Sequence, residues 1–255
     1  MKFKKMHGIG NDFVIFDARM ENLVITPDDM SLVADRHFGV GCDQVVVIDE
    51  SDTADVRVYF FNADGSESGA CGNASRCVAD LVMAESGEDS CSIEVNDGVL
   101  PCRKAGDLLV EVDMGAPRYV RDMDLSYGGV SKPVAVDMGN PHLVFFVDDL
   151  GDIDVEEVGA YFENHEAFPD RTNVEFVSVE DDGGLRQVTW ERGVGLTLAC
   201  GSGACAVAVA AAHRELAGRA VEITLDGGTL ELVWRESDGH VLMTGPVAYV
   251  FEGQI

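Results

Sequence analysis

The sequence predicts an α/β protein of two pseudo-symmetric domains, each a mixed, mainly antiparallel sheet wrapped around a central helix. Two observations predict this fold: the second half of the chain repeats the first, and each half combines several β-branched and aromatic runs with one strong helix. A chain of 255 residues suits one large domain or two smaller ones, and the repeat decides for two. We expect domains over residues 1–118 and 119–246, with a last strand at about 247–255 that is able to return to the first domain.

The repeat is clearest around two cysteines. The segment ACGNASRCVA at 70–79 recurs as ACGSGACAVA at 199–208, so that Cys71 and Cys200 are 129 positions apart. The same offset relates three further pairs of segments: 57–62 with 186–191, Gln44-Val45 with Asn173-Val174, and Gly10-Asn11 with Gly139-Asn140. Because the matches keep one order over most of each half, chance similarity does not explain them.

Within each half, strand-like runs precede the cysteine and a helix follows it. We predict the first helix over about 72–86, ended by Gly87, and the second over about 201–217, ended by Gly218, because glycine readily takes the left-handed conformation that ends helices. The second helix is rich in alanine on all sides, which suits a helix enclosed by strands. The strand-like runs of the first half are at 13–17, 45–49 and 56–61.

The chain is strongly acidic, with 46 Asp and Glu against 18 Lys and Arg and a formal net charge of −28. This excess disfavours binding to nucleic acid or to an anionic membrane, both of which attract basic surfaces. The N-terminal lysines precede no apolar stretch, and the longest small apolar run, 204–212, is far shorter than the ~20 residues of a membrane span. We therefore expect a cytoplasmic protein with neither nucleic acid nor membrane as a partner.

The cysteines indicate thiol chemistry. Seven cysteines in a chain with no export signal are typical of reduced thiols rather than of a disulfide framework. Cys71 and Cys200 each lie where a strand gives way to a helix, beside unpaired backbone N–H groups and the positive end of the helix dipole. We expect this position to lower the pKa of each thiol from its ordinary value of about 8.5, so that a thiolate can act as a base.

A pair of such thiols suits the inversion of an amino-acid α-carbon. Inversion needs a base on one face of the carbon and an acid on the other, and a thiolate and a thiol supply both. The backbone N–H groups at the two helix starts can hold the negative charge that spreads onto the carboxylate when the α-proton leaves. Pyridoxal phosphate is then unnecessary, and we expect no cofactor.

The other five cysteines receive no catalytic role. Cys77 and Cys205 fall inside the helices and are expected in the core, whereas Cys42, Cys91 and Cys102 have no repeated partner. Five residues separate Cys71 from Cys77, which is wider than the C-x₂₋₄-C motif of structural zinc, the four between Cys200 and Cys205 are at its upper limit, and no C-x-x-C motif occurs. We therefore predict no metal site, with zinc kept as a minor alternative.

Several ordered motifs resemble those of diaminopimelate epimerases along almost the whole chain. They are KMHGIGNDFVIFD at 5–17, GCDQ at 41–44, FNADGSESGACGN at 61–73, GNPH at 139–142, RTNVEF at 171–176 and WERGVGLTLACGSGA at 190–204. The resemblance implies a homodimer of pseudo-symmetric, two-domain subunits. It also implies an enzyme that interconverts LL- and meso-diaminopimelate, a small diamino-dicarboxylate, in lysine biosynthesis.

The resemblance also implies the site residues. These are a catalytic pair, Cys71 and Cys200; helix-start groups for the reacting carboxylate, Gly72, Asn73, Gly201 and Ser202; thiol-tuning residues, His142 and Glu191; and further substrate contacts, Asn11, Gln44, Asn62, Asn140, Asn173, Glu191 and Arg192. Arg192 is the expected partner of the distal carboxylate, because a guanidinium binds a carboxylate through two parallel hydrogen bonds.

The chain departs from the family pattern at two positions, and two alternatives stay open. Ala74 stands where a glycine is usual and Leu196 where an acidic residue is common, which leaves the substrate fit open. One alternative is an epimerase of the proline-racemase type with a smaller cyclic substrate, against which Arg192 and the surrounding amides argue. The other is a non-catalytic amino-acid-binding or thiol-sensing protein, which would bring no solvent deuterium to the substrate's α-carbon.

The acid excess predicts a dependence on salt, as in a protein with a halophile-like acidic surface from a salt-rich cytoplasm. At molar salt the Debye length is about 3 Å, so repulsion between carboxylates is largely screened. We expect the free energy of unfolding and the activity to rise when KCl is raised from low to multimolar concentration. Full stability without salt would contradict this interpretation.

Overall fold

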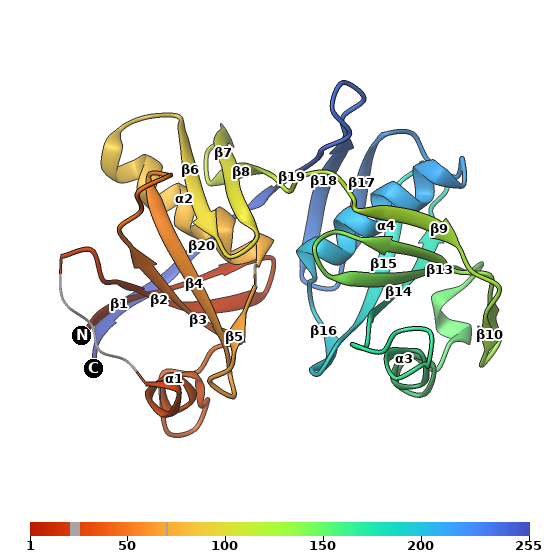
Figure 1. Cartoon of the computed structure of the whole chain (residues 1–255), viewed down its shortest axis with the longest axis horizontal. Helices are drawn as coiled ribbons and strands as arrows, with labels where there is room; N and C mark the ends of the chain where they lie inside the picture. Colours follow the sequence, from red (N-terminus) through yellow and green to blue (C-terminus); the bar gives the residue numbers. More distant parts are fainter. Residues whose placement is uncertain (21–25, 70) are drawn as a thin grey trace. The chain divides into compact units, whose positions relative to one another are not determined.

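Each half of the chain forms a compact unit with one long helix and a mixed sheet (Figure 1). The computed structural model describes residues 1–20, 26–69 and 71–255. Unit 1 comprises Met1–Val112 and Gly245–Ile255, and unit 2 comprises Asp113–Thr244. The predicted α/β fold is confirmed, and unit 1 ends ahead of the expected boundary at 118. Ala70, which opens the repeated cysteine segment, lies outside the described residues.

The elements of unit 1 are, in chain order, β1 (Lys2–Gly8), β2 (Asn11–Asp17), α1 (Pro27–Ala34), β3 (Gln44–Asp49), β4 (Val56–Asn62), β5 (Glu67–Ser68), α2 (Gly72–Ser86), β6 (Ser90–Val95), β7 (Gly98–Gly106), β8 (Leu109–Asp113) and the C-terminal β20 (Ala248–Gln254). Strand β20 pairs antiparallel with β1, so the end of the chain lies beside its beginning.

The elements of unit 2 are β9 (Tyr119–Asp122), β10 (Ser126–Tyr127), β11 (Val130–Ser131), β12 (Val134–Asp137), β13 (Pro141–Phe146), the 3₁₀ turn η1 (Leu150–Asp152), α3 (Val155–Glu163), β14 (Asn173–Val179), β15 (Leu185–Glu191), β16 (Gly195–Thr197), α4 (Gly201–His213), β17 (Ala220–Leu225), β18 (Gly228–Trp234) and β19 (Val241–Pro246). Strand β9 pairs antiparallel with β12.

The two units share one strand register. In unit 1, β2 pairs with β3 in parallel and Phe13 lies opposite Gln44. In unit 2, β13 pairs with β14 in parallel and His142 lies opposite Asn173. Phe13 and His142 are 129 residues apart, and so are Gln44 and Asn173, so the two strand pairs have the same register. Strands β4 with β6 and β15 with β17 are also parallel, whereas most other pairs within each unit are antiparallel.

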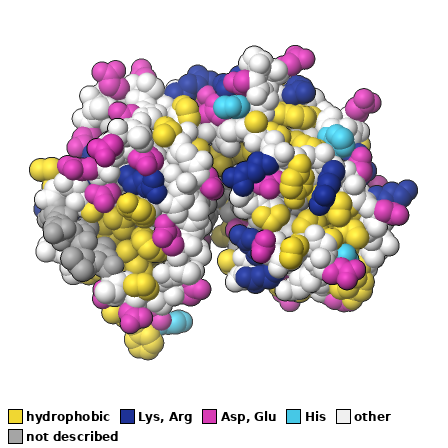
Figure 2. Space-filling model, in the orientation of Figure 1, with side chains coloured by type: hydrophobic (Ala, Val, Ile, Leu, Met, Phe, Trp, Pro, Cys, Tyr) yellow, Lys and Arg dark blue, Asp and Glu magenta, His cyan; other side chains and the backbone are white. Residues whose placement is uncertain are grey.

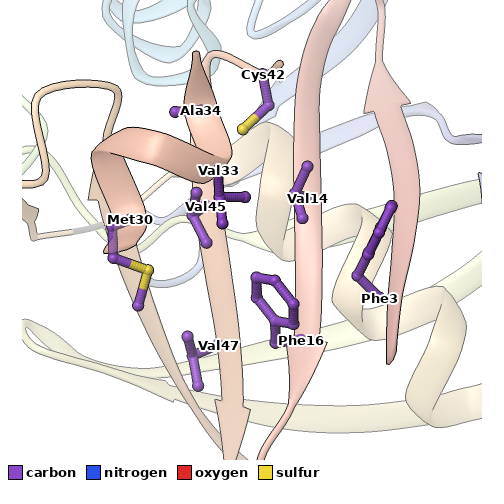
Figure 3. Packing of buried hydrophobic residues seen from close by; sticks show 9 residues of the cluster. All are labelled: Phe3, Val14, Phe16, Met30, Val33, Ala34, Cys42, Val45 and Val47. Carbon is purple, nitrogen blue, oxygen red and sulfur yellow. The ribbon is translucent and has the colours of Figure 1, made fainter. Parts of the chain in front are cut away.

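A short helix covers one face of the sheet in each unit. Parallel neighbours such as β2 and β3 need a crossover connection, and helix α1 lies on it. Figure 3 shows Met30 and Val33 of α1 directed toward Val14, Phe16 and Val45 on the sheet. Helix α3 occupies the same place between β13 and β14 and packs against β14, β15 and β16.

The sequence analysis did not predict α1 or α3, although α1 has a clear start signal. Thr26 is the N-cap and its side chain accepts a hydrogen bond from the backbone N–H of Asp29. The Asp29 carboxylate accepts one from the backbone N–H of Thr26 in return, and Pro27 occupies the first turn. This capping box fixes the start of a helix of only eight residues.

The two long helices occupy the centres of their units. Helix α2 packs against β1, β2, β6 and β7, and α4 packs against β9, β12, β13, β14, β17 and β18. Cys77 and Cys205 are fully buried inside these helices, so the prediction that they belong to the core is confirmed. The alanine-rich α4 is buried on nearly every side, as its composition indicates.

Acidic side chains are scattered over the face of unit 1 that Figure 2 shows. Of the acidic residues that the structure describes, Glu163 and Glu175 alone are buried. Glu163 has partners for its charge, because Arg171 and the Trp190 indole donate to it. Glu175 is fully buried and its Oε1 lies 2.7 Å from the ring nitrogen Nδ1 of His142.

The predicted end of the first helix is confirmed, but the predicted end of the second is wrong. Helix α2 ends at Gly87, which is left-handed with φ 77°, whereas α4 ends at His213, before Gly218. The backbone N–H groups of Glu215 and Leu216 donate to the carbonyls of Ala212 and Ala211 and close a Schellman motif. Its left-handed residue is Glu215 (φ 57°), a residue type that sequence rules do not expect there.

Replacement of Glu215 by glycine should therefore stabilise the protein. Glu215 is exposed and glycine takes the left-handed conformation without a steric cost, so we expect a gain of about 0.5–1 kcal/mol and a rise of ~2 °C in Tm. Thermal unfolding measures the effect. Glu215→Ala is the matched control, because it removes the side chain and keeps the strain. Equal melting temperatures for the two variants would contradict the explanation.

Candidate active site

Both repeated cysteines are the N-cap residues of the central helices. Cys71 precedes α2 with φ −142° and ψ 105°, and Cys200 precedes α4 with φ −120° and ψ 109°. Neither side chain makes a cap hydrogen bond, but as N-cap residues both cysteines lie beside the N–H groups of the first turn. The predicted placement of two thiols at two helix starts is what the structure shows.

In unit 1, polar side chains of the predicted set lie around Cys71. The Cys71 thiol, which is half-buried, donates to Asn11 Oδ1 over 3.7 Å. Asn73 Nδ2 on the first turn of α2 donates to the same oxygen over 3.2 Å. Gln44 and Asn62 form a second pair, because they lie opposite each other on β3 and β4, and Gln44 Nε2 donates to Asn62 Oδ1 at 3.0 Å.

In unit 2, the corresponding residues surround Cys200. Cys200 Sγ lies 3.7 Å from Ser202 Oγ, which accepts from Asn140 Nδ2 at 3.2 Å. Asn140 Oδ1 is 3.0 Å from His142 Nε2, and His142 Nδ1 is 2.7 Å from Glu175 Oε1. A continuous series of contacts thus joins a fully buried carboxylate to the second thiol.

Three further predicted residues lie at the end of β15 and opposite it. Asn173 uses its amide on the backbone: Nδ2 donates to Pro141 O at 3.0 Å, and Oδ1 accepts from the Arg192 N–H at 2.9 Å. Glu191 Oε1 accepts from the Thr197 hydroxyl at 2.6 Å. The half-buried Arg192 guanidinium donates to the carbonyl of Asp170 at 3.1 Å.

The electrostatics of Cys200 differ from the expectation. Burial raises the pKa of this thiol well above its ordinary value, and the negative charges of Glu191 and Glu175 raise it further. The Gly203 N–H and the Ser202 side chain act in the opposite direction and do not compensate. The prediction that the helix start lowers the pKa is therefore wrong for Cys200, because desolvation of a buried thiolate outweighs the helix N-terminus. These surroundings favour the thiol form of Cys200.

Gly203 makes room for the buried carboxylate beside this thiol. A Cβ atom at residue 203 would lie 2.7 Å from Glu175 Oε1 and 3.2 Å from Cys200 Sγ. With the offset of 129, the equivalent residue of unit 1 is Ala74, and the residue equivalent to Glu175 is Val46. Without a carboxylate at residue 46, the Ala74 side chain is accommodated in the core. Ala74 therefore departs from the family pattern where the structure tolerates it.

Two groups near the thiols were missed by sequence reasoning. Glu175 lies in NVEFV, a strand segment whose members are all buried, so a charged residue within a buried run was the available signal. The second group is a charge network in unit 1. Asp43 accepts from Asn11, and Arg36 donates to both Asp43 and Asp12. Nothing in the spacing of these residues indicates the network.

In the described ranges, no group of three or more His, Cys, Asp or Glu side chains is placed to hold a metal ion. No helix among the described residues is long and apolar enough to cross a membrane.

Comparison with known proteins identifies the family. A family model described as diaminopimelate epimerase matches residues 3–120 and 134–250. The diaminopimelate epimerase of Acidiphilium cryptum is 51% identical, over 99% of this chain and 95% of its own length. That of Methanococcus maripaludis is 41% identical, over 100% of this chain and 99% of its own length.

Among solved structures, a PhzF-family phenazine biosynthesis protein of Bacillus anthracis superposes with TM-score 0.76 at 16% identity, over 100% of this chain and 98% of its own. A probable proline racemase of Agrobacterium radiobacter gives 0.74 at 16%, over 100% and 92%, and both likenesses show the fold alone. The chain belongs to the diaminopimelate epimerase family.

Proposed function

We propose that this protein interconverts LL- and meso-diaminopimelate in lysine biosynthesis, by moving a proton at the α-carbon without a cofactor. The observation that carries the proposal is the pair of cysteines at equivalent helix starts of a duplicated fold, in a chain of this family. The diaminopimelate epimerases it resembles match it over almost their whole length.

Cys71 and Cys200 are the proposed acid and base, one for each face of the α-carbon. A thiolate takes the α-hydrogen as a proton, and the electron pair of the broken C–H bond spreads onto the carboxylate. The second thiol gives its proton to the opposite face and becomes a thiolate. The first sulfur is then a thiol, so the reverse reaction uses the two residues in exchanged roles. Burial and the neighbouring carboxylates favour the thiol form of Cys200, which suits it to the acid role.

The helix starts are proposed to hold the reacting carboxylate. Negative charge grows on that group as the proton leaves, and backbone N–H groups of Gly72, Asn73, Gly201 and Ser202 belong to the first turns where helix N–H groups lack helical partners. Fixed donors of this kind stabilise the charged intermediate more than the substrate, which accelerates the chemical step.

The far end of the substrate carries a second ammonium and a second carboxylate. We propose Arg192 for the carboxylate, and Asn11, Gln44, Asn62, Asn140, Asn173 and Glu191 for the remaining polar groups. Gln44 Oε1 is buried and finds no hydrogen-bond partner among the described residues, so an ammonium group can donate to it. Asn173 supports Arg192 by holding its backbone N–H. A homodimer in the cytoplasm is the proposed form and location.

Incubation with LL-diaminopimelate in D₂O tests the proposed reaction. We expect the meso epimer to form with deuterium at the inverted α-carbon, because the acid on the second face exchanges with solvent before it donates. Mass spectrometry and chiral separation follow both quantities, with L-proline as the control substrate. Turnover of proline but not of diaminopimelate would favour the proline-racemase alternative, and absence of deuterium from either would favour a binding protein.

Cys71→Ala and Cys200→Ala should each abolish inversion, because one face of the α-carbon loses its proton carrier. We expect kcat to fall at least about 10³-fold in each case. Cys91→Ala is the control, since Cys91 lies on β6 and its thiol donates to the carbonyl of Ala79 in α2. Near-normal turnover in either of the first two variants would refute the assignment.

Glu191→Gln should lower the pKa of Cys200. The Glu191 charge disfavours the Cys200 thiolate, so its removal shifts the thiol–thiolate equilibrium toward the thiolate and moves the pH profile of Cys200 alkylation to lower pH. Peptide mass spectrometry with a small alkylating reagent measures the profile. Glu236→Gln, which changes an exposed acid of the same unit, should leave it unchanged. An unchanged or raised midpoint in Glu191→Gln would contradict the tuning role.

A further inference from the structure

The repeated asparagines Asn11 and Asn140 both lie next to a helix start, but their amides point in opposite senses. Asn11 turns its oxygen toward α2, where Asn73 and Cys71 donate to it. Asn140 turns its NH₂ group toward α4, where Ser202 accepts. Since Asn73 and Ser202 are equivalent under the offset of 129, one repeated position presents an acceptor in unit 1 and a donor in unit 2.

In unit 1 the orientation is fixed by a carboxylate. Asn11 Nδ2 donates to Asp43 Oδ2 at 2.9 Å, and an ionised carboxylate has no hydrogen to offer in return. The amide must therefore give its NH₂ side to Asp43 and its oxygen to the thiol side. We propose that Asp43 is a positioning residue, which turns the Asn11 carbonyl oxygen toward Cys71 and so favours the thiol form of that cysteine.

Asp43 is itself held in place from three directions. Arg36 Nη2 donates to Asp43 Oδ1 at 2.9 Å, and the backbone N–H of Asp12 donates to Oδ2 at 3.1 Å. The backbone N–H of Asp43 donates to Asp12 Oδ1 at 3.0 Å. Asp12 is anchored in turn by Arg36 and by the buried Lys5. Burial alone would raise the pKa of Asp12, but Arg36 and Lys5 lower it to about 2, which keeps Asp12 ionised.

In unit 2 a different residue orients the asparagine amide. The residue equivalent to Asp43 is Thr172, whose hydroxyl donates to the backbone carbonyl of Asn173. Asn140 is held instead through its oxygen by His142, at a position where unit 1 has Phe13. The two halves thus share the asparagine but differ in the residue that orients it. The Asn11 and Asn140 amides therefore have opposite orientations relative to their helix starts.

The proposal rests on the proposed function, and alkylation of Cys71 tests it without a substrate. In Asp43→Asn the partner can donate as well as accept, so residue 43 no longer fixes the orientation of the Asn11 amide. When the Asn73 amide, which donates to the Asn11 oxygen, turns with it, the Asn11 NH₂ group can face the sulfur and stabilise a thiolate. We expect Cys71 to be alkylated faster by about tenfold at fixed pH. Asp43→Glu, which keeps the carboxylate, should restore the slow rate, and Asp12→Asn, which weakens the network and leaves the Asn11–Asp43 contact, should change it little.

A double-mutant cycle separates positioning from a structural effect. If Asp43 acts through Asn11, Asp43→Asn has no further effect on the Cys71 alkylation rate in an Asn11→Ala background. Additive effects of the two substitutions would overturn the proposal, and so would equal Cys71 alkylation rates in Asp43→Asn and the unaltered protein. If Asp43→Asn does not fold, Asp43→Thr, which introduces the residue type found at the equivalent position of unit 2, takes its place. Turnover of diaminopimelate is measured in parallel, with a fall in kcat expected for Asp43→Asn. Absence of turnover in the unaltered protein counts against the proposed function, whereas the alkylation cycle alone decides the role of Asp43.

Discussion

The register of the parallel strand pair in each unit is the constraint on which the site depends. The β2–β3 pair of unit 1 and the β13–β14 pair of unit 2 have the same register, displaced by 129 residues along the chain. The β4–β6 and β15–β17 pairs also correspond, with an offset of 129 for the first strand and 130 for the second. Slipping a strand by one residue would turn every side chain to the other face of the sheet. A fixed register therefore holds each asparagine, on the strand or turn before the crossover, beside the helix start that carries the cysteine.

Burial and charge, rather than the helix dipole alone, decide the state of the second thiol. Cys200 is 6% exposed and has two carboxylates near it, and these effects raise its pKa although the Gly203 N–H and Ser202 favour the thiolate. A raised pKa keeps a proton on the Cys200 thiol until the strongly basic carbanion takes it, and it makes the thiolate that remains a strong base. The site thus combines donors that stabilise the thiolate with surroundings that make it reactive.

Much of this arrangement was predictable from the sequence, because it depends on local signals and on the duplication. Gly87 ends α2 as a left-handed glycine should, and both cysteines occupy the N-cap position of the helix that follows them. The rest depends on tertiary contacts that sequence patterns do not encode. Glu215 takes the left-handed place at the end of α4, and the Asp43 network joins residues from β2, the α1 connection and the turn before β3. Helix α1 was missed because its eight residues are too few for a strong periodic pattern, although its capping box is visible.

In the proposed reaction, two sulfurs serve one α-carbon. A crystal structure of the protein with bound diaminopimelate gives the distances from Cys71 Sγ and Cys200 Sγ to that carbon. We expect both sulfurs within about 3.5 Å of it and on opposite faces. A complex in which one sulfur is remote from the α-carbon, or in which both lie on the same face, would contradict the proposed reaction.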